Sequence, residues 1–152
     1  MAEPDAGAPD TGAPLAESSP TLLEMGGLRF KVSFRTVGAT LSVYGRLDEA
    51  WVELLRFDDF VDGPHFHSPA DADSTPFDRA TLGEPLAWYI AEIRDHLAER
   101  LALAGYGDLV PTLDLEAISR GASALNEAMI ACVPAGFVRV PGVGLQRAGA
   151  AE

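Results

Sequence analysis

The alternation of apolar and polar residues in LRFKVSFR, residues 28–35, is the strictest pattern in the chain. Its apolar residues are Leu28, Phe30, Val32 and Phe34. Because successive side chains of an extended chain point to opposite faces, the pattern predicts a strand with one buried face. After a turn at TVG, residues 39–46 alternate in the same way, and residues 50–60 are apolar on both faces. Three strands joined by short connections favour an antiparallel meander.

Two later segments have the apolar periodicity of helices. In the first, Pro85 suits the first helical position and Gly105 suits the residue after the end. Its apolar residues recur every three or four positions, at Leu86, Ile90, Ile93, Leu97 and Leu101. In the second, Asp114 can cap the N-terminus and Pro134 stops the helix. The whole pattern predicts an α+β fold: a three-stranded antiparallel meander, then a motif loop, then an antiparallel helical hairpin packed on the sheet.

The composition divides the chain into three parts. Residues 1–26 are rich in Ala and Pro and carry acidic but no basic side chains, which predicts a disordered acidic leader. Residues 27–134 form the predicted single α+β domain. Residues 135–152 are rich in Gly, which predicts a loose C-terminal tail with one short strand at 136–140.

The charge of the chain restricts the classes of partner. The formal net charge is −12, which argues against nucleic acid, because phosphate binding needs clustered Lys and Arg. Many acidic groups repel anionic ligands and suit cations or basic partners. The expected partner is a small ligand or a protein of unknown identity, and a homo-oligomer stays open. The chain has no apolar run of about 18 residues and no secretory signal pattern, so we expect no membrane association and a cytoplasmic location. The single cysteine, Cys132, excludes an internal disulfide.

Two of the three histidines stand one residue apart in GPHFHSP, residues 63–69. Proline disfavours the helical conformation in the residue before it, so Pro64 and Pro69 favour an extended segment between them. In an extended chain His65 and His67 point the same way, and Phe66 points into the core. A strand of this kind can present two imidazoles to one metal ion.

Several carboxylates lie close in sequence to this pair, namely Asp58, Asp59, Asp62, Asp71 and Asp73. Two histidines and one carboxylate suit a divalent ion such as Zn, Fe or Mn, and the expected set is His65 and His67 with Asp59 or Asp62. The spacing does not fix the third ligand. Two other interpretations stay open: histidines that only bind backbone carbonyls, and a catalytic or ligand-binding pair that works without metal.

The run WVELLRFDDFVDGPHFHSP (51–69), the helix start PLAW and the helix stop AGY (104–106) resemble a family of small uncharacterised bacterial proteins. Members of that family have a strand ending in Arg-Phe-Asp, then a Pro-His-aromatic-His motif, then an amphipathic helix. The resemblance covers roughly residues 28–132 and implies a fold class but no activity. The matching positions are Arg56, Asp58, Phe60, Pro64, His65 and His67.

A fainter similarity to small toxins of toxin–antitoxin pairs implies action on RNA. This chain departs from those toxins, because no Arg or Lys stands next to the histidines. The similarity therefore gives little support for ribonuclease activity.

The sequence leads to two functional hypotheses. The first is a binding or accessory module, whose segment from Asp58 to His67 recognises a small ligand or a protein. The alternative is a metal-dependent enzyme that uses His65, His67 and an aspartate. No motif assigns a catalytic residue, and whether the chain is an enzyme stays open. The candidate site consists of Arg56, Asp58, Asp59, Asp62, His65 and His67.

Overall fold

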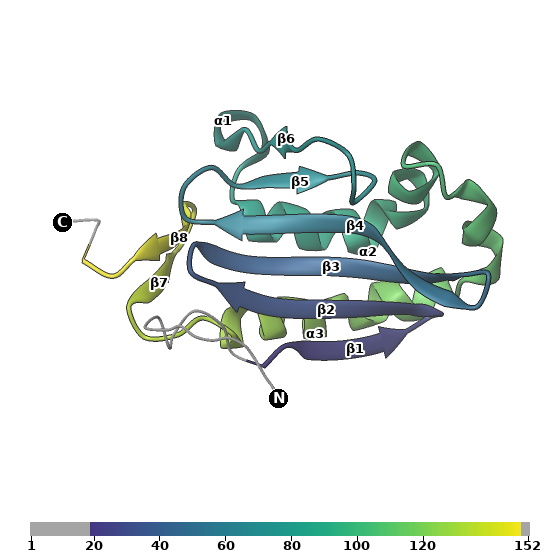
Figure 1. Ribbon diagram of the computed structural model, residues 1–152. Helices are drawn as coiled ribbons and strands as arrows, with labels where there is room; N and C mark the ends of the chain where they lie inside the picture. The colour runs from purple at the N-terminus through teal and green to yellow at the C-terminus, as the bar shows by residue number, and fades with distance from the viewer. Residues whose placement is uncertain (1–18, 150–152) are drawn as a thin grey trace.

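The computed structural model describes residues 19–149. Its main feature is an antiparallel sheet in which each strand pairs with the next one in sequence (Figure 1). The strands are β1 (Thr21–Met25), β2 (Leu28–Arg35), β3 (Gly38–Leu47), β4 (Ala50–Phe60), β5 (His65–His67) and β6 (Thr75–Pro76). The α+β class and the meander are confirmed, but the sheet has six strands rather than the expected three.

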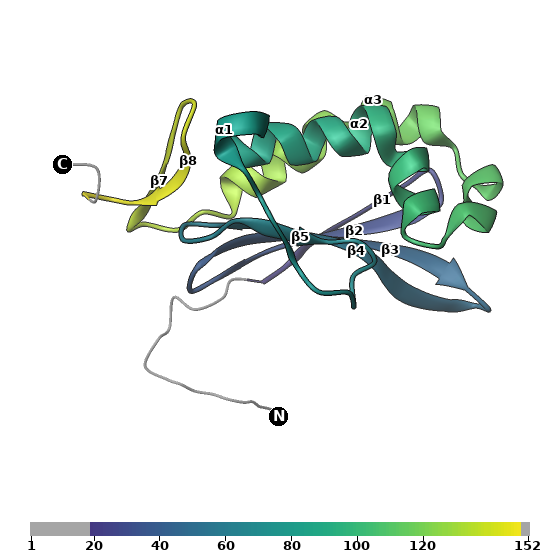
Figure 2. The ribbon, with the colours of Figure 1, turned by 90° about the horizontal axis from the view of Figure 1, so that it is seen from above.

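The helices follow the sheet in sequence and lie on one of its faces (Figure 2). They are α1 (Arg79–Leu82), α2 (Pro85–Leu103), a 3-10 helix (Gly107–Thr112) and α3 (Leu115–Ala131). The Asp114 side chain accepts a hydrogen bond from the Ala117 amide and caps α3, as the sequence predicted. Within residues 19–149, none of the helices combines the length and the apolar composition of a membrane span.

The core lies between the helices and the apolar face of the sheet. From the sheet come Phe30, Leu41 and Phe57, and from the helices come Ile93 and Leu125, all almost fully buried. The alternating residues of β2 behave as predicted, since Leu28 to Phe34 are buried at every second position. The opposite face of the sheet is covered by none of the described helices (Figure 2).

Leu97 lies on the buried face of α2 with 4% of its surface exposed. We expect Leu97→Ala to lower the free energy of unfolding by about 2–5 kcal/mol, because it removes buried methyl groups and leaves a cavity. Denaturant unfolding of both proteins measures the difference. Leu103→Ala is the matched control, because Leu103 is on the same helix and 80% exposed. Equal effects of the two substitutions would contradict the assignment of the buried face.

The expected leader requires a correction, because β1 lies within residues 1–26. Leu23 and Met25 pack against the core, and a Cβ added to Gly121 of α3 would lie only 2.2 Å from the Met25 sulfur. The expectation rested on the average composition of residues 1–26, which does not reveal a strand of only five residues at the end of that segment. The remaining part of the expected leader, residues 1–18, lies outside the described residues.

The C-terminal segment also differs from the expected loose tail. β7 (Phe137–Val140) pairs with β8 (Gly144–Arg147) in a separate two-stranded sheet. Leu145 is fully buried, and Arg139 reaches the main sheet to pair with Asp59. The short strand expected at 136–140 is therefore present, and it belongs to a hairpin that Leu145 and Arg139, among other side chains, hold against the domain.

Candidate metal centre

The motif expected to be a loop is largely a strand pair, in which β5 runs antiparallel to β4. In the register of this pair Asp58 is opposite His65, and Arg56 is opposite His67. Because neighbouring residues of a strand alternate between faces, these four side chains share one face. Phe57, which lies between Arg56 and Asp58, is buried in the core beneath the helices. The four side chains therefore lie on the uncovered face of the sheet.

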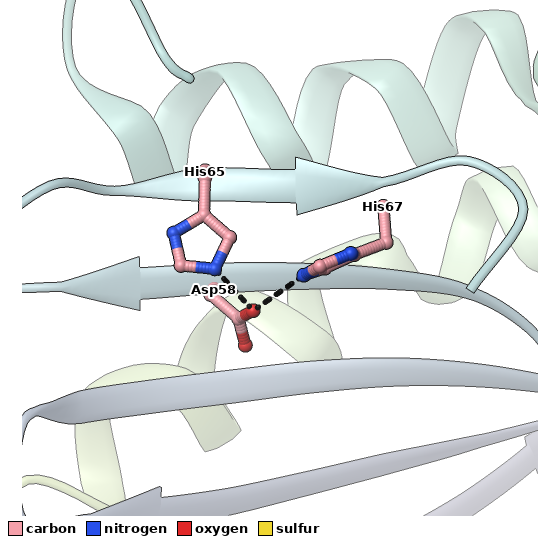
Figure 3. A group of neighbouring side chains, drawn as sticks. All are labelled: Asp58, His65 and His67. Carbon is pink, nitrogen blue, oxygen red and sulfur yellow. Dashed lines mark ion pairs between the residues drawn. The ribbon is translucent and has the colours of Figure 1, made fainter. Parts of the chain in front are cut away.

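Asp58, His65 and His67 bring their polar atoms together (Figure 3). The Asp58 Oδ2 atom is 3.0 Å from His65 Nε2 and 3.6 Å from His67 Nε2. Protein ligands bind first-row divalent ions at about 2.0–2.2 Å, so two ligand atoms on one ion lie about 2.9 Å apart at a right angle and about 3.4 Å apart at a tetrahedral angle. The two separations from Asp58 Oδ2 are close to these values.

The second nitrogen of each imidazole is held by a backbone carbonyl. His65 Nδ1 is 2.8 Å from the Gly63 oxygen, and His67 Nδ1 is 2.8 Å from the Ala72 oxygen. A carbonyl oxygen only accepts, so each Nδ1 carries the hydrogen and donates it. Each Nε2 then directs its lone pair towards Asp58. Metal-ligating histidines commonly show this arrangement, because the second hydrogen bond fixes the ring.

Asp58 is almost fully buried, with 3% of its side chain exposed. Its Oδ1 accepts a hydrogen bond of 2.8 Å from the Thr40 hydroxyl on β3, which fixes the carboxylate and leaves Oδ2 facing the histidines. Between His65 Nε2 and Asp58 Oδ2 two acceptors face each other at 3.0 Å unless a proton or a cation stands between them. The geometry of this pair therefore requires a hydrogen or a metal ion between the two atoms.

Arg56 is the fourth group at the site. Its Nε is 3.4 Å from Asp58 Oδ2, and its Nη2 is 3.1 Å from His67 Nε2. The guanidinium thus stands beside the carboxylate and donates to the lone pair of His67. One third of the Arg56 side chain is exposed, although its Nε is buried.

Tyr89 supports the site from the helix side. Its hydroxyl lies 3.0 Å from the Asp58 carbonyl and 3.1 Å from the His65 carbonyl, so it bridges the two strands where the site residues pair. Burial, together with the negative charges of Asp59 and Asp58, raises the pKa of Tyr89 well above its ordinary value. The hydroxyl therefore keeps its hydrogen and remains a donor.

The third group beside the histidines is Asp58, in place of the Asp59 or Asp62 that we expected to complete the metal set. Asp59 points to the opposite face, where its Oδ2 pairs with Arg139 at 2.6 Å. Burial raises the pKa of Asp59, and the neighbouring Arg139 opposes this effect. Asp62 is exposed after the end of β4 and pairs with Arg147 at 3.1 Å. Strand alternation explains the correction, because residue 59 shares the face of Phe57 and residue 58 does not.

Other residues lie away from this group. His96 is exposed on α2 and contacts Glu99 at 3.0 Å. Cys132 is half-buried at the end of α3, and burial raises the pKa of its thiol. Sequence reasoning missed Thr40 and Tyr89. Thr40 could have been found by pairing the strands, whereas no sequence signal shows that Tyr89 packs behind the site.

The comparisons with known proteins identify a family but no activity. Residues 22–129, well over half of the chain, match the model of a family described as a domain of unknown function (DUF7700). This confirms the resemblance to an uncharacterised family. A search of curated proteins and a search of solved structures gave no match to this chain.

Proposed function

Because the chain belongs to the DUF7700 family, which carries no assigned activity, we propose a function from the site geometry alone: the domain binds one divalent cation through Asp58, His65 and His67. One observation carries the proposal. Both imidazoles donate their Nδ1 hydrogens to backbone carbonyls and direct Nε2 towards the same carboxylate oxygen. The same orientation occurs in both rings, which suits two ligands of one ion.

The donor set favours Zn²⁺, Fe²⁺ or Mn²⁺. Imidazole binds all three, and two imidazoles with one carboxylate are a common set for such ions in proteins. The three ligands come from one side, because all project from the same sheet face, so positions on the solvent side remain for water or a ligand. The His65 side chain is 23% exposed there. A metal-dependent enzyme is thus the form of function that this site would support.

A second candidate is a binding or accessory module that works without metal. The contact between Arg56 Nη2 and His67 Nε2 favours it, because the guanidinium already satisfies the nitrogen that a metal would take. In this case Arg56, Asp58 and the two histidines would form a polar surface for a ligand or a protein.

Metal binding to the wild-type protein distinguishes these candidates. Protein purified without a His-tag is stripped with a chelator and dialysed separately against Zn²⁺, Mn²⁺ and, without oxygen, Fe²⁺. We expect one ion per chain for at least one metal. We also expect the free energy of unfolding to rise by about 2.7 kcal/mol when the free metal concentration is a hundred times Kd, because the ion binds only the folded chain. Thermal unfolding with and without the metal detects this gain. If no metal is retained and stability does not change, the metal-free module is the better account.

A further inference from the structure

Arg56 loses its hydrogen-bond acceptor when a metal binds. Its Nη2 now donates to His67 Nε2, but that lone pair would coordinate the ion. Among the residues that the structure describes, the Arg56 Nε is buried and has no hydrogen-bond partner. With the ion in place, Nη2 of the Arg56 guanidinium would lack an acceptor, and a second cation would stand beside it. A negatively charged acceptor would accept this hydrogen bond and would also offset the two positive charges.

The charge around the site points to the same kind of ligand. Asp58 is the one carboxylate of the metal-binding group, so its single negative charge would have to balance the charges of both the ion and Arg56. The next side chains on the same row across the sheet are Ser42 on β3 and Lys31 on β2. The row adds another cation and no acid. An anion approaching from the solvent side would therefore meet a positive potential.

This positive region contrasts with the rest of the chain, whose formal net charge is −12. By strand alternation the uncovered face of β2, β3 and β4 carries a group of basic residues: Arg29, Lys31, Arg35, Arg46 and Arg56. Among the described residues of β1 to β4, the acids on this face are Glu24, Glu53 and Asp58, and Glu24 pairs with Arg29. Within these four strands basic residues therefore outnumber acidic ones on this face, although the loop beside His67 adds Asp71 and Asp73.

We infer that the metal site takes a small ligand bearing an oxyanion, a carboxylate or a phosphate, with one oxygen on the ion and another on Arg56. This inference rests on the proposed metal function. The three protein ligands leave coordination positions on the solvent side, and the guanidinium fork matches the paired oxygens of either group. Arg56 thereby changes partner, from His67 in the metal-free site to the ligand in the metal-bound one.

The test uses the full chain loaded with Co²⁺, whose visible absorption reports changes at the ion. Acetate and inorganic phosphate are titrated in separate experiments, which distinguish a carboxylate from a phosphate preference, and the Co²⁺ content is measured before and after. Arg56→Gln removes the proposed anion contact. Arg46→Gln is the matched control, because it removes one charge from the same face at a position that stacks on Trp51.

We expect at least one of the two anions to change the spectrum of the wild-type protein. Arg56→Gln should lower the affinity for that anion at least tenfold. The variant should bind Co²⁺ as tightly as the wild type or more tightly, because a cation next to the ion has been removed. Arg46→Gln should change anion affinity less than twofold. A Co²⁺-loaded wild type that binds neither anion, or equal losses in the two variants, would overturn the inference. A wild type that binds no Co²⁺ would instead refute the metal site itself.

Discussion

Replacing both His65 and His67 by alanine is expected to abolish metal binding, with a loss of affinity of at least a hundredfold for the ion that the wild type retains. The two imidazoles supply two of the three ligand atoms, and one carboxylate alone is a weak site. Equilibrium dialysis with metal analysis gives the stoichiometry, and thermal unfolding without metal shows whether the fold survives. If the histidines were only structural, the double variant would bind as much metal as the wild type. It would also have a lower free energy of unfolding, both with and without added metal.

His96→Ala is the control for this experiment. It removes the third histidine of the chain from an exposed position on α2, away from the site. We expect it to leave both stoichiometry and affinity unchanged. Stoichiometric metal that persists in the double variant would show that the ion binds elsewhere.

The second large effect concerns Asp59, the residue next to the site on the opposite face of β4. We expect Asp59→Ala to lower the free energy of unfolding by about 3–5 kcal/mol, because it leaves the Arg139 guanidinium in the protein interior without its carboxylate. Asp59 is fully buried, and Arg139, 14% exposed, also donates to the Met129 carbonyl near the end of α3. The pair thus joins the C-terminal hairpin to both the sheet and the helix layer.

Asp62→Ala is the matched control for Asp59→Ala. It removes the same charge from a pair with Arg147 that is largely exposed, so we expect a loss below about 1 kcal/mol. Denaturant unfolding at constant pH compares the two. A loss in Asp59→Ala no larger than in Asp62→Ala would show that the hairpin is not held by this pair.

Strand and helix positions with strong periodicity were predictable from the sequence. The alternation in residues 28–35 identified the buried face of β2, and Pro85 and Asp114 marked the starts of α2 and α3. β1, β8 and the pairing of β8 with the strand expected at 136–140 were not predicted, because each strand has only four or five residues within a segment of acidic or Gly-rich composition. Their stability comes from contacts with distant residues, which composition does not report.

The candidate site was predictable in part for the same reason. Two prolines and the spacing of the histidines predicted that His65 and His67 point the same way, and both side chains do face Asp58. The structure groups Asp58 with the histidines, and not the Asp59 or Asp62 that we expected as third ligand. That expectation followed closeness in sequence, whereas the pairing of β5 with β4 selects the residue opposite His65. The roles of Thr40 and Tyr89 depend on packing between elements, which a single sequence does not show.

X-ray absorption at the metal edge of the wild-type protein with one equivalent of Zn²⁺ tests the proposed site most directly. The account predicts two imidazole nitrogens at about 2.0–2.1 Å, with the outer-shell pattern of the rings, and oxygen ligands at about 2.0–2.2 Å from Asp58 and solvent. A sulfur neighbour at about 2.3 Å would place the ion at Cys132, and a shell of oxygens alone would place it among surface carboxylates. Either of these two results would contradict a metal centre formed by Asp58, His65 and His67.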